Sequence, residues 1–158
     1  MIKLIIFFLI VFVNYKYALG RNIGETEITT EDGIEVFQEE KYYLLKKNVE
    51  IISDEFELNG DLVKIYFEKD LYDIQEIFAS TDVTFISMAY NIKGKGEALT
   101  FKVQNEQINV TGIKSELFLE TTQMFSDGSI TVNNIVGSFS IKGPNSKLIT
   151  DEIFITGF

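Results

Sequence analysis

The chain has 158 residues, of which 46% are hydrophobic and 13% aromatic, which is enough for one domain with a sizeable core and too little for two. It contains no Cys, His or Trp, which excludes disulfides, zinc sites built on Cys or His, Cys nucleophiles and catalysis by an imidazole. The net charge of −10 argues against a nucleic-acid partner, because phosphate binding needs a cationic surface. No Gly-rich phosphate loop is present, and no cofactor is expected.

Residues 1–20 have the features of a secretory signal peptide. A basic start precedes an unbroken apolar run over residues 4–13, and Ala18 and Gly20 are small, as a signal peptidase requires. We predict cleavage after Gly20 and a single mature domain of residues 21–158. The alternative is a retained membrane anchor, but such a run rises about 15 Å as a helix, half of a ~30 Å hydrocarbon core. The high Ile, Lys, Asn and Phe content is typical of an AT-rich bacterial genome and favours the periplasm.

Short runs of alternating apolar and polar residues, separated by turn residues, fill the rest of the chain. This period-two pattern predicts β-strands, and no window of helical periodicity exceeds about three turns. The fold class expected is all-β and antiparallel, with about 14–16 strands. After a short strand around Ile28, the expected strands cover residues 34–38, 42–46, 49–53, 55–59, 62–67, 72–80, 83–87, 90–93, 97–103, 107–111, 116–121, 129–132, 135–142 and 148–155.

One hairpin pattern recurs along the chain. Residues 99–112 form two apolar alternating arms around a polar turn, and residues 34–47 and 65–77 repeat this design. The segment that starts at Asn48 also aligns with the segment that starts at Asp82, 34 residues later, and a third copy is degraded. Such fixed-period similarity indicates stacked supersecondary units. Each unit is expected to contribute about four strands and to bury its apolar face only against its neighbours.

The ordered phrases that carry this repeat resemble a known family. Between residues 28 and 112 the chain contains NVEI, FELNGD, VKIYF, IQEIFASTDVTF, GKGEALTF and INVTG in that order. This set is similar to the OstA/LptA family of periplasmic proteins, which carry lipopolysaccharide from the inner to the outer bacterial membrane. The last third of the chain matches only loosely.

The resemblance implies a twisted, partly open β-jelly roll with a V-shaped apolar interior. It also implies unpaired strands at both ends, through which proteins of the same fold join edge to edge. The partners implied are lipopolysaccharide, an LptC-like inner-membrane protein, an LptD-like outer-membrane protein and further copies in an end-to-end homo-oligomer.

A carrier of acyl chains needs a long apolar groove, because each CH₂ left in water costs about 0.8 kcal/mol. Two facing strand layers form such a groove if they splay apart instead of sealing. Phe56, Phe85 and Phe101 are favoured for lipid contact, since bulky aromatics at equivalent inward positions can line a wall without filling it. The alternative is the core of a closed sandwich. The candidate lining residues are Val36, Val49, Ile51, Phe56, Leu58, Val63, Ile65, Phe67, Val83, Phe85, Leu99, Phe101, Val103, Ile108 and Val110.

Two segments could serve as exposed edges. Residues 26–30 and 148–158 have little charge or proline to prevent pairing with another strand, which suits strand addition to a partner sheet. The polar residues 150–152 interrupt the second segment. The alternative is a solvated last strand packed within the domain.

Acidic clusters are the remaining feature of chemical interest. Carboxylate pairs serve glycosidases, but the clusters at residues 39–40, 54–57 and 68–73 lie in turns or on polar strand faces, where charges are usually solvated. Their spacing does not resemble an EF-hand. We therefore expect neither an enzyme nor a metal site. The alternatives to a transport bridge are an LptC-like anchored partner and a stand-alone lipid-binding or structural β-domain.

Overall fold

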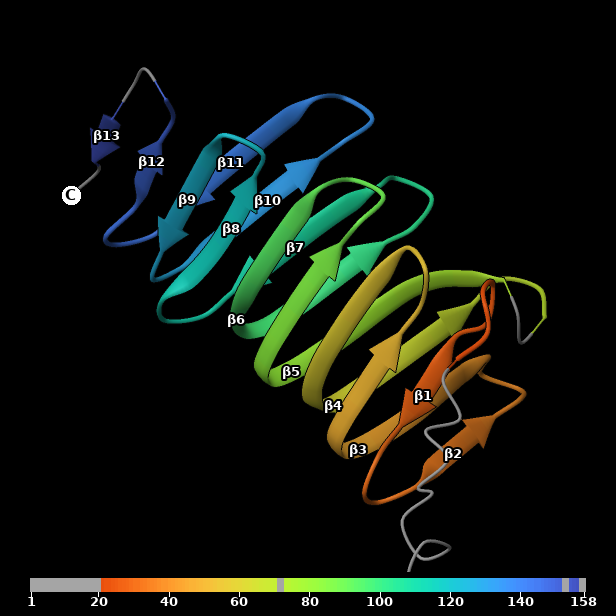
Figure 1. Ribbon diagram of the computed structural model, residues 1–158. Coiled ribbons are helices and arrows are strands. Elements are labelled where there is room, and N and C mark those ends of the chain that lie inside the picture. Colours follow the sequence, from red (N-terminus) through yellow and green to blue (C-terminus); the bar gives the residue numbers. More distant parts are fainter. Residues whose placement is uncertain (1–20, 71–72, 152–153, 157–158) are drawn as a thin grey trace, which may run out of the picture.

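The computed structural model describes residues 21–70, 73–151 and 154–156, so the predicted signal peptide lies outside the described residues. The described chain folds into a 13-stranded antiparallel sheet (Figure 1), which confirms the all-β prediction. No helix long and apolar enough to cross a bilayer occurs among these residues. The strands are β1 (Glu27–Thr29), β2 (Ile34–Phe37), β3 (Tyr42–Ile52), β4 (Phe56–Phe67), β5 (Ile74–Ser87), β6 (Ile92–Lys102), β7 (Gln107–Thr111), β8 (Ser115–Leu119), β9 (Thr122–Ser126), β10 (Ser129–Asn133), β11 (Ser138–Lys142), β12 (Lys147–Ile149) and β13 (Phe154–Thr156).

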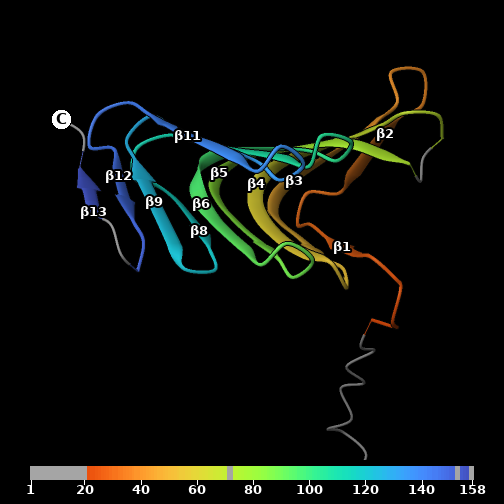
Figure 2. The same ribbon diagram turned by 90° about the horizontal axis from the view of Figure 1, so that it is seen from above.

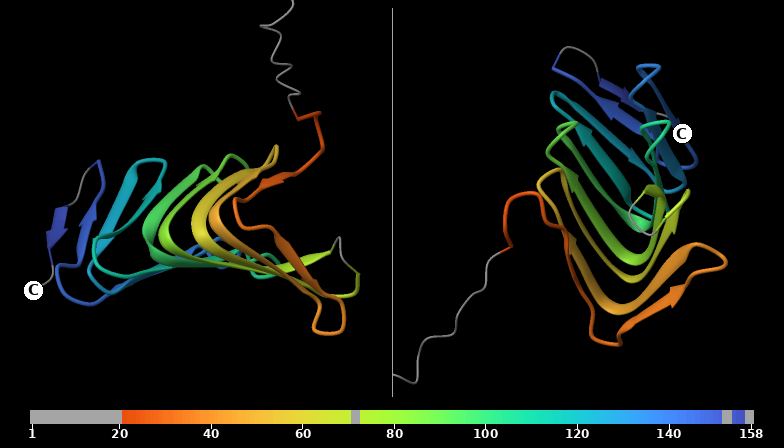
Figure 3. Two further views of the ribbon diagram at one scale, coloured as in Figure 1. Left: turned by 90° about the horizontal axis from the view of Figure 1, so that it is seen from below. Right: turned by 90° about the vertical axis from the view of Figure 1, so that its right-hand side faces the viewer.

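The long strands β3 to β6 bend, so that each contributes to two walls of a V (Figure 3). Their ladders shift register at the bend, between Lys46 and Val49 in the β3–β4 pair and between Ser80 and Val83 in the β5–β6 pair. The first wall contains one half of each long strand together with β1, β8, β9, β12 and β13. The second wall contains the other halves together with β2, β7, β10 and β11.

Beyond β6 the strands break at the corner of the V instead of bending through it. β6 pairs with β8 through residues 92–95 in the first wall and with β7 through residues 98–102 in the second. Residues 112–114 separate β7 from β8, and residues 143–146 separate β11 from β12. Both walls therefore continue to the C-terminal end, where β12 and β13 lie opposite the β1 and β2 end (Figure 2).

The 34-residue repeat corresponds to a pair of bent strands. Lys47 and Asn48 have φ values of 67° and 47°, and Thr81 and Asp82 have φ values of 69° and 50°. These left-handed pairs lie at equivalent corners, where they turn the strand from one wall into the other. Each unit therefore contains two bent strands rather than four separate ones.

The strand count accordingly differs from the expected 14–16. The separate strands predicted at residues 42–46 and 49–53 are the two halves of β3, and β4, β5 and β6 each combine two predicted strands in the same way. In the opposite direction, β9 was not predicted. The turn that joins β8 to β9 contains neither Gly nor Pro, so the sequence shows no turn signal there. Glu120 in this turn has a positive φ.

Side chains on the inner faces of both walls form the core. Each wall has a row of residues in cross-strand register that points into the V. The row of the first wall is Ile28, Ile51, Leu58, Phe85, Gly94, Leu117, Met124 and Leu148. The row of the second wall is Val36, Tyr43, Ile65, Ile77, Phe101, Ile108, Val132 and Phe139.

Candidate functional site: an apolar groove

The two inner rows run without interruption from one end of the described sheet to the other; their side chains are buried in the middle and, in the second wall, exposed at both ends. In the middle of the second wall, Ile77 and Ile108 are each 1% exposed. At the two ends of the same row, Val36 is 49% exposed and Phe139 is 47% exposed. The ends are open because β2 pairs only with β3, and β11 only with β10, among the described strands. The apolar surface therefore reaches both ends of the sheet.

The structure places the predicted lining residues on this inner surface. Val36 lies in the second-wall row at the open end, and Val103, which is 37% exposed, lies at the rim. Phe56 is half-buried and packs against the core. The remaining predicted residues are buried: Val49, Ile51, Leu58, Val63, Ile65, Phe67, Val83, Phe85, Leu99, Phe101, Ile108 and Val110.

The three favoured phenylalanines meet at one cavity between the walls. The ring centroids of Phe56 and Phe85 are 6.1 Å apart, and those of Phe85 and Phe101 are 5.8 Å apart, within the range of favourable aromatic contacts. Together with Ile74 and Ile77 they line a cavity of about 290 Å³. We call this space, in the middle of the groove, the phenylalanine cavity.

Polar groups surround the mouth of the phenylalanine cavity. Glu55, Asp73 and Tyr90 lie on its border. Burial raises the pKa of the Tyr90 hydroxyl, and the charge and hydrogen bond of the Glu106 carboxylate raise this pKa further. The Tyr90 phenol therefore stays protonated at neutral pH. Sequence reasoning did not single out Tyr90, which was expected to begin a strand at residues 90–93 and instead lies in the turn before β6.

Three lysines of β6, Lys93, Lys95 and Lys102, lie on the outer face of the walls. Lys93 and Lys95 alternate along β6 with Ile92 and Gly94, which face inward, and Lys102 follows the inward Phe101. All three lysines are exposed. They do not border the phenylalanine cavity.

Free edges lie at both ends of the described sheet. Among the described strands, β1 and β2 at one end each pair only with β3, and at the other end β11 pairs only with β10 and β13 only with β12. The predicted edge segments at residues 26–30 and 148–158 contain β1 and β13. The free edges of the second wall, β2 and β11, were not predicted. The sequence pattern of each hairpin shows that two strands pair, but it does not show whether a third strand pairs on the other side.

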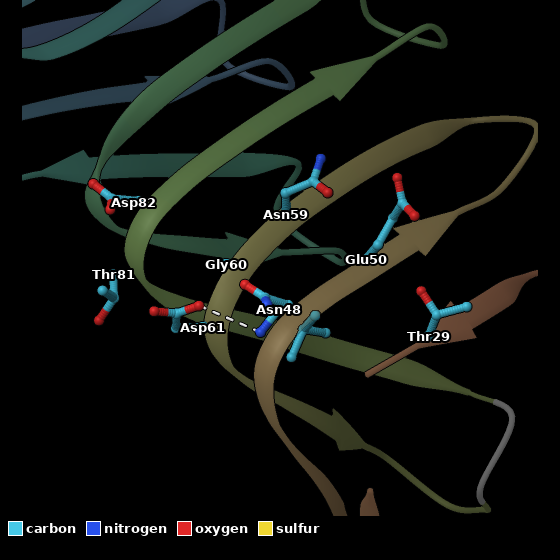
Figure 4. A pocket seen from close by; sticks show the side chains of 9 residues that line it. Thr29, Asn48, Glu50, Asn59, Gly60, Asp61, Thr81 and Asp82 are labelled. Carbon is cyan, nitrogen blue, oxygen red and sulfur yellow. Dashed lines mark hydrogen bonds between the residues drawn. The ribbon is translucent and has the colours of Figure 1, made fainter. Parts of the chain in front are cut away.

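A separate hollow of about 450 Å³ lies on the convex side of the corner (Figure 4). It is lined by polar side chains, among them Asn48, Glu50, Asp61 and Asp82. The Asn48 backbone N–H donates a hydrogen bond to Asp61 Oδ1 at 3.3 Å. Within the described ranges, no cluster of acidic side chains has the geometry of a metal site. This hollow faces away from the groove.

No family model matches the sequence, and no curated protein matches it. A solved structure does match the fold: LptH from Pseudomonas aeruginosa, described as the LptA-homologous periplasmic component of a conserved lipopolysaccharide transport device. The match covers 80% of this chain and 95% of that chain, with a TM-score of 0.65 and 9% sequence identity. The protein therefore has an LptA-like fold, an open antiparallel β-jelly roll.

Proposed function

We propose that this protein is a periplasmic component of a lipopolysaccharide transport bridge, in which the groove carries the acyl chains of the lipid. The observation that carries the proposal is the second-wall row, which runs from exposed Val36 through a buried middle to exposed Phe139. A closed sandwich would cover this surface at both ends. An apolar row that reaches two open ends is instead suited to continue into another sheet.

The free edges support a bridge rather than a stand-alone domain. Unpaired strands normally favour edge-to-edge association, and strand addition supplies main-chain hydrogen bonds that extend a sheet. In this proposal, β1 and β2 at one end and β11 and β13 at the other meet an LptC-like inner-membrane protein, an LptD-like outer-membrane protein or another copy of the chain. The apolar rows of the partners then join into one trough.

Export is part of the proposal. Residues 1–20 act as a cleaved signal peptide, which delivers residues 21–158 to the periplasm. The mass of the mature protein tests this point, since loss of the first 20 residues rules out an LptC-like anchored protein. The proposed role is not enzymatic, and movement of the lipid is driven by a separate inner-membrane pump.

Photo-crosslinking at two neighbouring residues tests the groove directly. Phe101 is 7% exposed on the inner face, whereas Lys102 is exposed on the outer face of the same strand. A photoreactive phenylalanine analogue at position 101 is expected to capture lipopolysaccharide, and the same analogue at position 102 is not. Equal labelling at the two positions contradicts the groove.

A further inference from the structure

The outer face of the second wall carries its own row of side chains in cross-strand register. The row alternates with the inner row of this wall, so its members point away from the groove. Its members are Phe37, Tyr42, Tyr66, Glu76, Lys102, Gln107, Asn133 and Ser138. The row thus joins aromatic side chains on β2, β3 and β4 to charged, amide and hydroxyl side chains on the following strands.

The three rings of this row form a platform on the outer face. The ring centroids of Phe37 and Tyr42 are 4.5 Å apart with an interplanar angle of 14°, and those of Tyr42 and Tyr66 are 5.5 Å apart. Lys64 Nζ lies 5.7 Å from the centroid of the Tyr42 ring, within the range of a cation–π contact. All three rings are half-buried. The platform is therefore ordered by its own contacts and still accessible from outside.

A hollow of about 400 Å³ lies beside the platform on the same face. It is lined by Glu76, Thr100, Lys102, Gln107, Asn109 and Thr111, which occupy outward positions of β5, β6 and β7. The long side chains of Glu76, Lys102 and Gln107 are consecutive in the outer row, whereas Thr100 and Thr111 beside them are short. The hollow arises from this difference in length. Glu76 is also the cross-strand partner of Tyr66, so hollow and platform adjoin.

The polar groups of the hollow have few partners within the protein. Asn109 Nδ2 donates a hydrogen bond to Thr131 Oγ1 at 3.1 Å, but the buried Asn109 Oδ1 has no partner. Glu76 and Lys102 are directly opposite one another, yet neither they nor Gln107 form a side-chain hydrogen bond or ion pair with another described residue. Buried polar groups are normally paired. The hollow therefore offers donors and acceptors to a ligand.

This combination of a ring platform and a polar hollow fits a glycan. One face of a sugar ring carries C–H groups that pack on an aromatic ring, while its edge carries groups that donate and accept hydrogen bonds. The hollow has one carboxylate and one ammonium group, so their charges balance and favour a neutral ligand over an anionic one. The Gln107 amide is both donor and acceptor, which matches an N-acetyl group. Neighbouring strands lie about 4.8 Å apart, close to the length of one sugar unit.

We propose that the outer face of the second wall binds a neutral, linear glycan with N-acetyl groups, whose rings pack on the platform and whose polar groups enter the hollow. The chain lies across the strands, with successive sugars over successive strands. This outer site lies on the opposite face from the groove and does not depend on the proposed function. It holds the protein to a glycan while the groove stays accessible to lipid.

An NMR titration with a hexamer of β-1,4-linked N-acetylglucosamine tests the outer site. The side-chain amide signals of Gln107 and Asn109 are expected to shift. The amide of Gln123, exposed on β9 in the first wall, is expected to stay in place. No shift at Gln107 and Asn109, or an equal shift at Gln123, overturns the site. A hexamer of glucose is expected to bind less tightly, and equal affinities contradict the pairing with an N-acetyl group.

Two variants with matched controls test the two parts of the site. Gln107→Ala is expected to lower the affinity for the N-acetylglucosamine hexamer about tenfold by calorimetry, whereas Gln123→Ala leaves it unchanged. Tyr66→Ala removes a ring of the platform and is also expected to weaken binding. Its control is Phe125→Ala, which removes a ring that contacts Phe118 and Lys147 in the first wall. Parent affinity in both test variants overturns the site.

The same titration separates the outer site from the groove. Ile51 and Leu58 lie on the inner row of the first wall, 1% and 0% exposed. Their methyl signals are expected to stay in place when the hexamer binds. Shifts at Ile51 and Leu58 in place of shifts at Gln107 put the sugar in the groove and overturn the outer site. Failure of the outer site leaves the proposed lipid transport untouched, because that proposal rests on the inner rows and the free edges.

Discussion

The middle of the groove and its two ends are built from the same rows of residues, yet they differ in exposure. In the row of the second wall, Ile77 in the middle is 1% exposed, whereas Val36 at one end is 49% exposed and Phe139 at the other is 47% exposed. The difference in exposure arises from the number of neighbouring strands, because a central strand has a neighbour on both sides and an end strand has a neighbour on one side only. The middle therefore supplies stability, and the ends are left available for association.

The largest expected effect separates stability in the middle from stability at the ends. Leu58 is fully buried in the first wall, so Leu58→Ala is expected to lower the free energy of unfolding by about 2–5 kcal/mol. Val36→Ala, at the exposed end of the row, is expected to cost less than ~1 kcal/mol. Urea denaturation measures both. Equal losses would show that the ends are as tightly packed as the middle.

A smaller effect is expected at the corner beneath the middle of the groove. A Cβ atom on Gly96 would lie 2.5 Å from Val110 Cγ1 and 3.0 Å from the Thr111 carbonyl oxygen. Gly96→Ala is expected to destabilise the protein by about 1–3 kcal/mol through overpacking. Gly60→Ala is the control, because its Cβ would come no closer than 3.4 Å to the Ser80 carbonyl oxygen. Thermal unfolding compares the two, and equal losses would refute a close approach specific to Gly96.

At the ends, the expected effect is on association. Phe139→Lys places a charge on the apolar row beside a free edge, and it is expected to weaken end-to-end self-association at least tenfold, while the free energy of unfolding changes by less than ~1 kcal/mol. Sedimentation at rising protein concentration measures the association. Ser140→Lys, on the opposite face of β11, is the control. If both variants associate equally well, the apolar row does not take part.

The smallest expected effect is on the pH dependence of stability, at the turns of the C-terminal half where the strands break between the two walls. A hydrogen bond from Asn145 Nδ2, at 2.5 Å, and one from the Lys114 backbone N–H, at 2.9 Å, hold the pKa of Asp127 below its usual value. The stabilisation is therefore present above the unfolded pKa of about 3.9 and is lost as the pH falls through the folded pKa.

Asp127→Asn tests this pH dependence. The variant is expected to be less stable than the parent at neutral pH and to approach it as the pH falls through the folded pKa. Urea denaturation at several pH values measures the difference, and an NMR titration of the Asp127 carboxyl gives its pKa directly. A stability difference that is independent of pH would rule out a role for the charge.

The alternating pattern and the 34-residue repeat predicted most of the sheet and the inward face of the groove. They did not show that two predicted strands are one bent strand, because the corner at Thr81 and Asp82 uses positive φ values at residues other than Gly. They also did not single out Tyr90, which lies in the turn between β5 and β6 and borders the phenylalanine cavity.

The most direct test of the groove is a methyl NMR titration with lipopolysaccharide. Ile77 and Ile108 are each 1% exposed on the inner surface, whereas Ile86 and Ile113 are 37% and 64% exposed away from it. Lipid in the groove is expected to shift the methyl signals of Ile77 and Ile108 and leave those of Ile86 and Ile113 in place. Shifts of equal size at all four isoleucines would contradict an apolar groove that carries lipid.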